Sequence, residues 1–448
     1  MKTILLLGAG MSASSLIRYL LQHAEAHDWQ LRVVDQSLEL VQRKLGGHPR
    51  GVALSFNALD RSERWEELKN ADLVISMLPA RFHVEVAKDC LELKKQLITP
   101  SYVSPEMRAL DAEVKAAGLL FMNEIGVDPG IDHMSAMQII DIIRAKGGKI
   151  TSFKSYCGGL IAPESDNNPW NYKFTWNPRN VVLAGQGIAA QFIDHGQYKY
   201  LPYGQLFARL DHLEIPGFGA FDGYANRDSL SYREVYGLED IPTLYRGTLR
   251  RTGYCQSWNI FVQLGMTDDS YELAEAETLT ARTFLNTFLP YDETKSIEEK
   301  FTIFCAKFGI HDIERFRWLG LFDGETIVGF AHATPAQLLE KILVNKWVLE
   351  PNDKDMLVMV HEFRYDLDGQ THEINSSMVN IGEDSVFTSM SNTVGLPVGI
   401  CAKLMLSGKL QETGVHIPTM KSVYQPILEE LRSLGIRFDE TERLIGAC

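Results

Sequence analysis

The residue whose surroundings most suggest chemistry is Asp128, in the segment Asn123–His133 with the sequence NEIGVDPGIDH. Upstream of this segment, short apolar runs alternate with helical patterns, whereas downstream the predicted strands are longer and richer in aromatic residues. Two domains are therefore expected to meet here. If the upstream domain binds a nucleotide, Asp128 lies at the carboxyl edge of its sheet, where ligands of such folds bind. The alternative interpretation is a plain helix start, with Asp128 or Asp132 as N-cap.

The sequence GAGMSA, residues 8–13, has the spacing of a dinucleotide-binding loop. It follows a predicted buried strand, Ile4–Leu7, and opens a predicted helix. Gly8 permits the tight turn from strand to helix, Gly10 lets the backbone approach a pyrophosphate, and the small Ala13 lets the helix pack on the strand. Because the loop sits in this context, it predicts dinucleotide binding more specifically than its glycines alone.

Asp35, at the end of the second predicted strand, bears on which dinucleotide binds. A carboxylate at this position accepts hydrogen bonds from the 2′-hydroxyl of the adenosine ribose and repels a 2′-phosphate. Gln36 follows it instead of an arginine, and the next basic residues, Arg43 and Lys44, come a turn or two later. The sequence therefore allows NAD(H) or NADP(H) and favours NAD(H).

Residues 1–130 are predicted to form a Rossmann-type, doubly wound parallel sheet of the α/β class. Its strands are predicted at Ile4–Leu7, Leu31–Val34, Val52–Leu54, Leu73–Ser76, Leu97–Thr99 and Leu119–Phe121. Ser101 and Tyr102 follow the fifth strand, where hydroxyl groups are well placed to contact a nicotinamide or a substrate carboxylate. His83 is interpreted as a helix residue near this edge of the sheet and not as a catalyst.

The second domain is predicted over residues 131–390, and two arginines stand out in it. A strand at Ile150–Cys157 is expected to break at Gly158 and Gly159. Later, the segments YANRDS and YRGTLR place Arg227 and Arg246 beside small polar residues. A guanidinium fork supported by hydroxyl or amide groups is a common way to bind a carboxylate. The alternative is that each arginine forms a surface ion pair.

The remaining segments predict supporting structure. Residues from about 267 to 346 are expected to be a helical insertion, and Asp366–Gly369 separates two strands with a hairpin signal. His361-Glu362 and His372-Glu373 lie in these strands and lack the helical spacing of a zinc motif, so no metal site is predicted. Residues 391–448 are expected to form helices that close the nucleotide domain.

Composition sets limits on the partners. The chain has 448 residues and a formal net charge of −14, which argues against nucleic acid or an anionic membrane as a partner. No stretch approaches the roughly 20 apolar residues of a membrane span. The six cysteines are scattered without a pairing rhythm, so a reducing cytoplasm is the expected compartment.

Five longer strings together resemble the saccharopine dehydrogenase family in its glutamate-forming branch, the saccharopine reductases. The strings are NEIGVDPGIDH, SYCGGLIAPE, NPWNYKFTWNPR, YANRDS and YRGTLR, and they match in order over nearly the whole chain. The resemblance implies a Rossmann domain completed by the C-terminal helices, a substrate domain on a mixed sheet that also mediates a homodimer, and a small helical insertion. It also implies the reaction, in which glutamate and 2-aminoadipate 6-semialdehyde condense to an imine that NAD(P)H reduces to saccharopine, or the reverse.

The resemblance also implies site residues. Carried over by motif, the substrate contacts are Ser101, Tyr102, Asp128, Arg227, Arg246, Gly247 and Thr248, and the cofactor contacts are Gly8, Gly10, Met11, Ser12, Asp35 and Leu78. Asp35 departs from relatives that use NADP(H), so the cofactor of the family cannot simply be transferred.

The chemistry of the residues agrees with this reaction. Saccharopine carries three carboxylates, which explains why an acidic protein would reserve arginines for its site. Proton transfer at the imine needs a donor and an acceptor, for which Asp128, Tyr102 and Cys157 are the catalytic candidates. Two alternatives remain: a related imine-reducing enzyme such as a carboxynorspermidine dehydrogenase, and a nucleotide-binding homologue without turnover.

Overall fold

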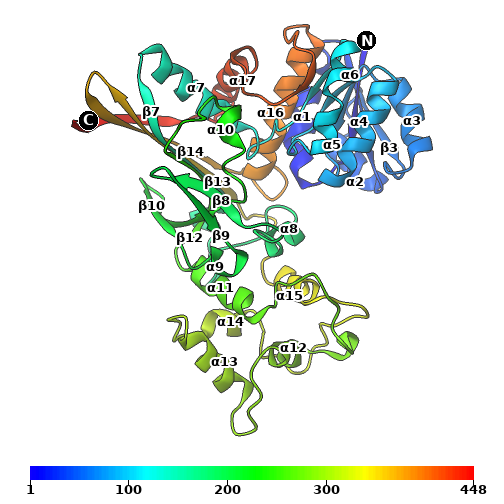
Figure 1. Ribbon diagram of the computed structural model, residues 1–448. Coiled ribbons are helices and arrows are strands. Elements are labelled where there is room, and N and C mark those ends of the chain that lie inside the picture. Colours follow the sequence, from blue (N-terminus) through cyan, green and yellow to red (C-terminus); the bar gives the residue numbers. More distant parts are fainter. Residues whose placement is uncertain (448) are drawn as a thin grey trace. The chain divides into compact units, whose positions relative to one another are not determined.

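The computed structural model describes residues 1–447, and the chain contacts divide it into two compact units. Unit 1 consists of residues 1–150 together with the chain from 364 onward, and unit 2 of residues 151–363 (Figure 1). The sequence placed the divisions at 130 and 390 instead. The helix Ile131–Ala145 belongs to unit 1, where it contacts a C-terminal helix, Lys421–Ser433, that is remote in sequence.

Unit 1 is built on a parallel sheet in the order β15-β6-β5-β4-β1-β2-β3. The strands are β1 (Lys2–Leu7), β2 (Trp29–Asp35), β3 (Gly51–Ser55), β4 (Leu73–Ser76), β5 (Gln96–Ile98), β6 (Leu120–Met122) and β15 (Gly414–His416). The six strands predicted from the N-terminal sequence are all present, which confirms the doubly wound α/β class. The seventh, β15, comes from a region where only helices were predicted, because a strand of three residues leaves little pattern in the sequence.

Helices cover both faces of this sheet (Figure 1). They are α1 (Ser14–Ala24), α2 (Leu38–Leu45), α3 (Arg61–Lys69), α4 (His83–Glu92), α5 (Pro105–Ala109), α6 (Asp111–Ala116) and α16 (Ser389–Leu406). Unit 1 also contains α7 (Ile131–Ala145) and α17 (Lys421–Ser433), which pack on each other. Helix α16 packs directly on α1, and a Cβ at Gly395 would lie 2.8 Å from the backbone nitrogen of Leu16. The buried Ser15 hydroxyl also donates to Asn392 Oδ1 (2.5 Å). The C-terminal helix therefore supports the start of α1, which follows the glycine-rich loop.

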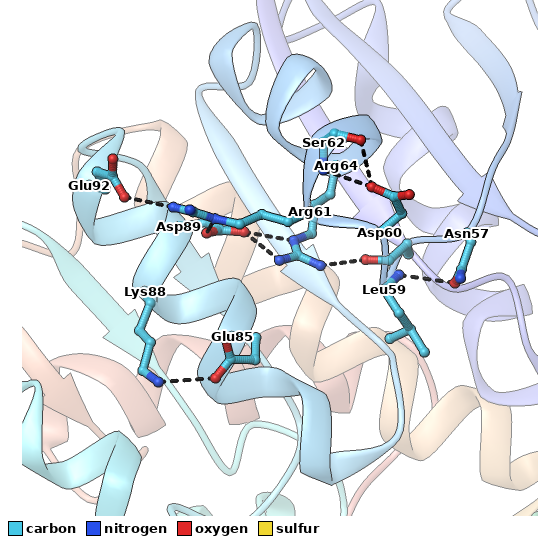
Figure 2. A network of polar contacts seen from close by, with 11 residues as sticks. Asn57, Leu59, Asp60, Arg61, Ser62, Arg64, Glu85, Lys88, Asp89 and Glu92 are labelled. Atoms are coloured by element: carbon cyan, nitrogen blue, oxygen red, sulfur yellow. Dashed lines mark hydrogen bonds and ion pairs between the residues drawn. The ribbon is translucent and has the colours of Figure 1, made fainter.

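A buried ion pair joins α3 to α4 beneath the surface of unit 1 (Figure 2). Arg64 Nη2 lies 2.5 Å from Asp89 Oδ2, and both side chains are at most 4% exposed. Arg64 also donates to the carbonyl of Ala58 (2.7 Å). By contrast, the Lys88–Glu85 pair in the same view is exposed on one helix face. The buried pair therefore fixes the contact between the helices, whereas the exposed pair contributes little.

Unit 2 contains a mixed sheet in the order β10-β11-β12-β7-β13. The strands are β7 (Lys149–Ile161), β8 (Ala190–Asp194), β9 (Gln197–Leu201), β10 (Asp211–Ile215), β11 (Gly219–Ala225), β12 (Thr243–Arg251) and β13 (Asp355–Leu367). Strands β7 and β12 are parallel, whereas β10, β11 and β12 are antiparallel. The predicted break at Gly158 was wrong, because β7 continues through both glycines. A Cβ at Gly158 would lie 2.7 Å from the carbonyl oxygen of Leu249, so the glycine allows close strand packing instead.

The predicted hairpin after β13 is confirmed. Asp368 and Gly369 both have positive φ angles, 51° and 73°, as a tight hairpin turn requires. The following strand, β14 (Gln370–Ile381), pairs in unit 1 with β16 (Asp439–Ala447), a second C-terminal strand that was not predicted.

An aromatic core and a set of short helices complete unit 2. Trp170, Tyr254, Trp258, Phe261 and Trp347 form a continuous group of ring contacts. The helices are α8 (Pro178–Val182), α9 (Tyr203–Leu206), α10 (Tyr232–Val235), α11 (Tyr254–Leu264), α12 (Ala281–Thr287), α13 (Ile297–Ala306), α14 (Glu314–Trp318) and α15 (Pro335–Val344). The predicted insertion is thus helical. Over residues 1–447, none of the helices has the length and apolar character that crossing a bilayer needs.

Candidate active site

The glycine-rich loop has the geometry that a dinucleotide needs. Gly8 has a φ of 100°, and a Cβ there would lie 3.0 Å from the carbonyl oxygen of Met77, so a side chain would be strained and crowded. A Cβ at Gly10 would meet nothing within 4 Å. Gly10 and Met11 are exposed, and Ser12 is half-buried. The loop thus leaves open space at the backbone where a pyrophosphate would approach the start of α1, and these residues fit a bound dinucleotide.

The carboxylate of Asp35 lies at the same edge of the sheet and is held by the backbone. Its Oδ2 accepts a hydrogen bond from the amide of Ala9 (2.9 Å), and its Oδ1 accepts from the amide of Ser37 (3.2 Å). Asp35 therefore fixes the glycine-rich loop to the end of β2. Each carboxylate oxygen has more than one acceptor site, so the same group keeps capacity for a ribose hydroxyl.

Lys44, on α2, also contacts the loop. Its ammonium group donates to the carbonyl of Gly10 (2.6 Å) and to the hydroxyl of Ser14 (2.8 Å). Burial lowers the pKa of Lys44 to about 8, and the nearby Asp35 opposes this shift. The sequence showed Lys44 only as a basic residue after β2 and did not reveal this contact. Leu78 lies just beyond β4, half-buried against the apolar core of unit 1.

Tyr102 and Asp128 come together at the carboxyl ends of β5 and β6. The Tyr102 hydroxyl donates to Asp128 Oδ1 (3.0 Å), and Tyr102 is 44% exposed. The loop that carries Asp128 is tight, because the amide of Gly126 donates to the carbonyl of Pro129 (2.9 Å). At Gly130, with a φ of 146°, a Cβ would lie 2.1 Å from the carbonyl oxygen of Gly126. The phenol of Tyr102 and the carboxylate of Asp128 therefore lie within hydrogen-bond distance on a tightly packed loop.

Asp128 is not the N-cap of α7, so the alternative interpretation of Asp128 as a helix cap is wrong. The N-cap is Gly130, whose amide donates to Asp132 Oδ1 (2.6 Å). Below this turn, the fully buried His133 Nε2 lies 2.8 Å from Glu124 Oε2, and Glu124 Oε1 accepts from the amide of Val103 (2.9 Å). This buried group links the Tyr102 segment to the Asp128 loop.

Ser101 takes part in a buried chain of polar side chains around His83. His83 Nε2 lies 2.8 Å from Ser101 Oγ and 3.1 Å from Thr99 Oγ1, and its Nδ1 lies 2.9 Å from Ser76 Oγ. Burial lowers the pKa of His83 to about 4, so the ring is neutral near pH 7. The sequence predicts His83 near this edge of the sheet, and its hydrogen bond in the structure holds Ser101 in position.

The predicted substrate residues of unit 2 lie on β12 and on the loop after β11. Arg227 is exposed, and its guanidinium forms no ion pair among the described residues. It therefore does not form the surface ion pair that the alternative interpretation expected. Arg246 is only 5% exposed, and its Cζ lies 4.3 Å from the centroid of the Tyr232 ring. The Arg246 amide donates to Ser229 Oγ (2.9 Å), so the two predicted arginine segments are joined.

Thr248 and Cys157 are neighbours in the parallel pairing of β12 with β7. Cys157 is 8% exposed, and Thr248 is half-buried. Gly247 is required by packing, because a Cβ there would lie 2.7 Å from the Tyr156 ring. Strand alternation places Arg246 and Thr248 on one face of β12 and Gly247 on the other. Over residues 1–447, no group of His, Cys, Asp and Glu side chains has the arrangement to hold a metal ion.

Known proteins match both parts of the chain. Residues 4–122 match the saccharopine dehydrogenase NADP binding domain family, and residues 126–436 match the saccharopine dehydrogenase C-terminal domain family. The chain belongs to the saccharopine dehydrogenase family. This confirms the resemblance drawn from the motifs. The protein is an NAD(P)-binding oxidoreductase of the saccharopine dehydrogenase type.

Individual relatives agree with the family assignment. The chain is 35% identical over 441 residues to the Saccharomyces cerevisiae saccharopine dehydrogenase [NADP(+), L-glutamate-forming], covering 96% of this chain and 97% of that protein. It is 33% identical to the mitochondrial alpha-aminoadipic semialdehyde synthase of Mus musculus, of which it spans 47%. The solved apo structure of the yeast L-Glu-forming enzyme superposes with a TM-score of 0.87 at 32% identity, covering 99% of this chain and 100% of that one. The fold predicted from the sequence is therefore that of the family.

Proposed function

We propose that this protein forms or cleaves saccharopine: L-glutamate and 2-aminoadipate 6-semialdehyde, with NAD(P)H and a proton, give saccharopine, NAD(P)+ and water. The observation that carries the proposal is the similarity to the yeast L-glutamate-forming enzyme over nearly the full length of both chains. The residues expected from the motifs support it. A hydroxyl and a carboxylate are paired at the carboxyl edge of the unit 1 sheet, and an exposed arginine, Arg227, and a buried one, Arg246, lie in unit 2.

The reaction sets tasks that these side chains suit. The amine of glutamate attacks the aldehyde carbon, and loss of water from the adduct gives the imine. A dinucleotide held at the glycine-rich loop and Asp35 would supply the hydride for the imine carbon, and the nitrogen would gain a proton to give the secondary amine. We assign the proton transfers at the reacting nitrogen and oxygen to Asp128 and Tyr102, because they share a hydrogen bond of 3.0 Å.

Cys157 remains a third candidate for proton transfer. It lies on β7 beside Thr248, one of the proposed substrate contacts. As a buried thiol it is more suited to shaping the site than to carrying a charge. Ser101 is proposed as a further substrate contact that His83 holds in place through their hydrogen bond.

We propose Arg227, Arg246 and Thr248 as carboxylate receptors. A guanidinium binds a carboxylate through two parallel hydrogen bonds, which neither a lysine nor a hydroxyl alone can supply. Arg227 is exposed and has no ion pair to break within the described residues, and Arg246 is held by its buried backbone and by the Tyr232 ring. Gly247 would keep the backbone between Arg246 and Thr248 close to the substrate.

We propose NAD(H) as the preferred cofactor. The Asp35 carboxylate is fixed beside the glycine-rich loop by two backbone amides, and a fixed negative charge there repels a 2′-phosphate. The relative from yeast is named for NADP(+), so this preference would be a point of difference. We also propose a homodimer and a reducing compartment; none of the five described cysteines is in a disulfide, and all five are buried.

A purified-protein assay tests the proposal. The rates of NADH and NADPH oxidation are measured with glutamate and the semialdehyde, and the reverse reaction is measured with saccharopine. We expect turnover with saccharopine and a preference for NADH. Absence of turnover with either cofactor, or turnover only with another amine and aldehyde pair, would refute the substrate assignment; a tenfold preference for NADPH would refute the role of Asp35.

A further inference from the structure

Arg250 is a buried arginine that has no role in the reaction proposed above. It lies on β12 and is 4% exposed. Its Nη1 donates to the carbonyl of Leu249 (2.8 Å), and its Nε has no hydrogen-bond partner among the described residues. No carboxylate within residues 1–447 forms an ion pair with it. A guanidinium has five N–H donors, so most of the hydrogen-bonding capacity of this buried cation is unused.

The acid nearest to Arg250 in strand register is engaged elsewhere. Asp222 lies opposite Arg250 in the antiparallel register of β11 and β12. Its Oδ1 lies 2.8 Å from His212 Nδ1, and its Oδ2 accepts from the amide of Gly253 (2.9 Å). Asp222 thus contacts His212 and the turn at Gly253 and, within the described chain, forms no ion pair with Arg250.

Three tyrosines surround the guanidinium instead. The Arg250 Cζ lies 5.2 Å from the ring centroid of Tyr172, 5.5 Å from that of Tyr254 and 5.8 Å from that of Tyr224. Ring faces offset part of the cost of burying a cation, but they do not accept its remaining N–H groups as a carboxylate does. A buried charge without an opposite charge beside it is costly, so buried charges in proteins are usually paired.

The Tyr172 hydroxyl is a second unsatisfied polar group at this place. It is buried and makes no hydrogen bond of good geometry with the described residues. The nearby Trp176 side chain lowers its pKa slightly, against the larger effect of burial. Burial is the main influence and raises the pKa of Tyr172, so the hydroxyl keeps its proton. A neutral hydroxyl and a guanidinium are both donors, and together they fit an anion with several acceptor sites.

The position of Arg250 connects it to the proposed substrate residues. Strand alternation puts Arg246, Thr248 and Arg250 on one face of β12, at intervals of about 7 Å. Thr248 is half-buried and Tyr224 lies opposite it in register, so the row continues from the proposed receptors to the Arg250 group. A flexible substrate with several carboxylates matches such a row of cations.

We infer that Arg250 and the Tyr172 hydroxyl form a third carboxylate subsite, which takes one carboxylate of the amino-acid substrate. The inference rests on the proposed function, because it adds a third guanidinium to Arg227 and Arg246 for a substrate with three carboxylates. A carboxylate there would accept hydrogen bonds from both groups and neutralise the buried cation. Arg250 would then select substrates by their number of carboxylates.

Steady-state kinetics of Arg250→Gln tests this subsite, with Arg251→Gln as the matched control. Arg251 is the next residue, lies on the opposite face of β12, and stacks on Phe221 with its Cζ 4.5 Å from the ring centroid. We expect Arg250→Gln to raise the KM for saccharopine about 10- to 100-fold, with the KM for the dinucleotide within about twofold of wild type. Arg251→Gln should leave both KM values near wild type. Equal KM values for saccharopine in the two variants would overturn the inference.

If Arg250→Gln does not fold, Tyr172→Phe tests the same subsite. Removing an unsatisfied buried hydroxyl should leave the melting temperature unchanged or higher. We expect this variant nevertheless to raise the KM for saccharopine about three- to tenfold. An unchanged KM would show that the cluster only packs the core and would overturn the subsite.

A binding experiment separates this inference from the proposed function. If the wild-type protein fails to turn over saccharopine, the proposed reaction is wrong, and the subsite is then tested with glutamate and glutarate as probes. Millimolar dicarboxylate should raise the melting temperature of wild type and of Arg251→Gln, but not that of Tyr172→Phe or Arg250→Gln. Protection that is absent in wild type, or equal in all variants, would overturn the subsite as well.

Discussion

The carboxylate of Asp35 accepts a hydrogen bond from the backbone amide of Ala9, at 2.9 Å, and so joins the end of β2 to the glycine-rich loop. One side chain thereby has two expected roles. It positions the loop that would face the pyrophosphate, and it places a negative charge where a 2′-phosphate would lie.

Replacing Asp35 with alanine should reduce the preference for NADH. We expect the ratio of kcat/KM for NADH to that for NADPH to fall about tenfold or more, because the charge that repels the 2′-phosphate is gone. The KM for NADH should also rise, since the loop loses its anchor. Initial rates with both cofactors check this.

Asp72→Ala is the matched control for the loop anchor. Asp72 Oδ2 also accepts a hydrogen bond from a β1 amide, that of Thr3 (2.7 Å), at the start of the strand instead of its carboxyl end. It should leave the cofactor ratio unchanged. A ratio that moves equally in both variants would contradict the role of Asp35.

Replacing Tyr102 with phenylalanine should lower kcat with little change in the KM for the dinucleotide. The hydroxyl that donates to Asp128 is lost, so proton transfer at the reacting nitrogen slows by an expected factor of about 10 to 100. Asp128→Asn should lower kcat further, by about 100- to 10,000-fold, because an amide side chain cannot act as a general base near pH 7. Rapid mixing with isotopically labelled dinucleotide would show whether hydride transfer itself has slowed.

The control for Tyr102 is Tyr424→Phe in the same unit. Tyr424 makes a similar pair with Asp141, at 2.6 Å between its hydroxyl and Oδ2, on α17 and α7. This substitution should leave kcat unchanged. If Tyr102→Phe and Tyr424→Phe have the same kcat, then the hydroxyl of Tyr102 has no part in the reaction.

His83 should make the protein less stable as the pH falls. Its ordinary pKa of 6.5 is lowered by burial to about 4, so between these values the unfolded chain binds a proton that the folded protein does not. Stability is therefore expected to fall from about pH 6.5 down to about pH 4, by roughly 3 kcal/mol in total, and then to change no further through this residue.

Urea unfolding of wild type and His83→Gln, at pH 7 and at pH 4.5, measures this effect. The variant should lose less free energy of unfolding between the two pH values than wild type. His195→Gln serves as control, because His195 is exposed and should not alter the difference. An identical pH dependence in wild type and His83→Gln would exclude His83 as its source.

Breaking the Arg64–Asp89 pair should destabilise unit 1 strongly. Asp89→Asn leaves the buried guanidinium of Arg64 without its charged partner, which is expected to cost about 3 to 5 kcal/mol of unfolding free energy. The double variant Arg64→Met with Asp89→Leu should cost less, because no charge is left buried. Denaturant unfolding curves of both variants test this order.

Glu85→Gln is the control on the neighbouring exposed pair with Lys88, drawn in the same view (Figure 2). It should change the unfolding free energy by less than about 1 kcal/mol. A loss as large as that of Asp89→Asn would mean that burial does not distinguish the two pairs.

The sequence by itself determined the features that depend on neighbouring residues. The loop from Gly8 to Ala13, the hairpin turn at Asp368 and Gly369, and the six N-terminal strands follow from local spacing, because turns and strand patterns are set by residues close in the chain. The long motifs identified the family for the same reason.

Tertiary structure alone decided which distant groups meet. Strand β15 is too short to predict and exists because it pairs with β6. The contacts of Lys44 with Gly10, of His83 with Ser101 and of Arg250 with Tyr172 join residues from different elements. Burial lowers the pKa of Lys44 and of His83, and burial is a property of the packed chain that residue type and spacing do not contain.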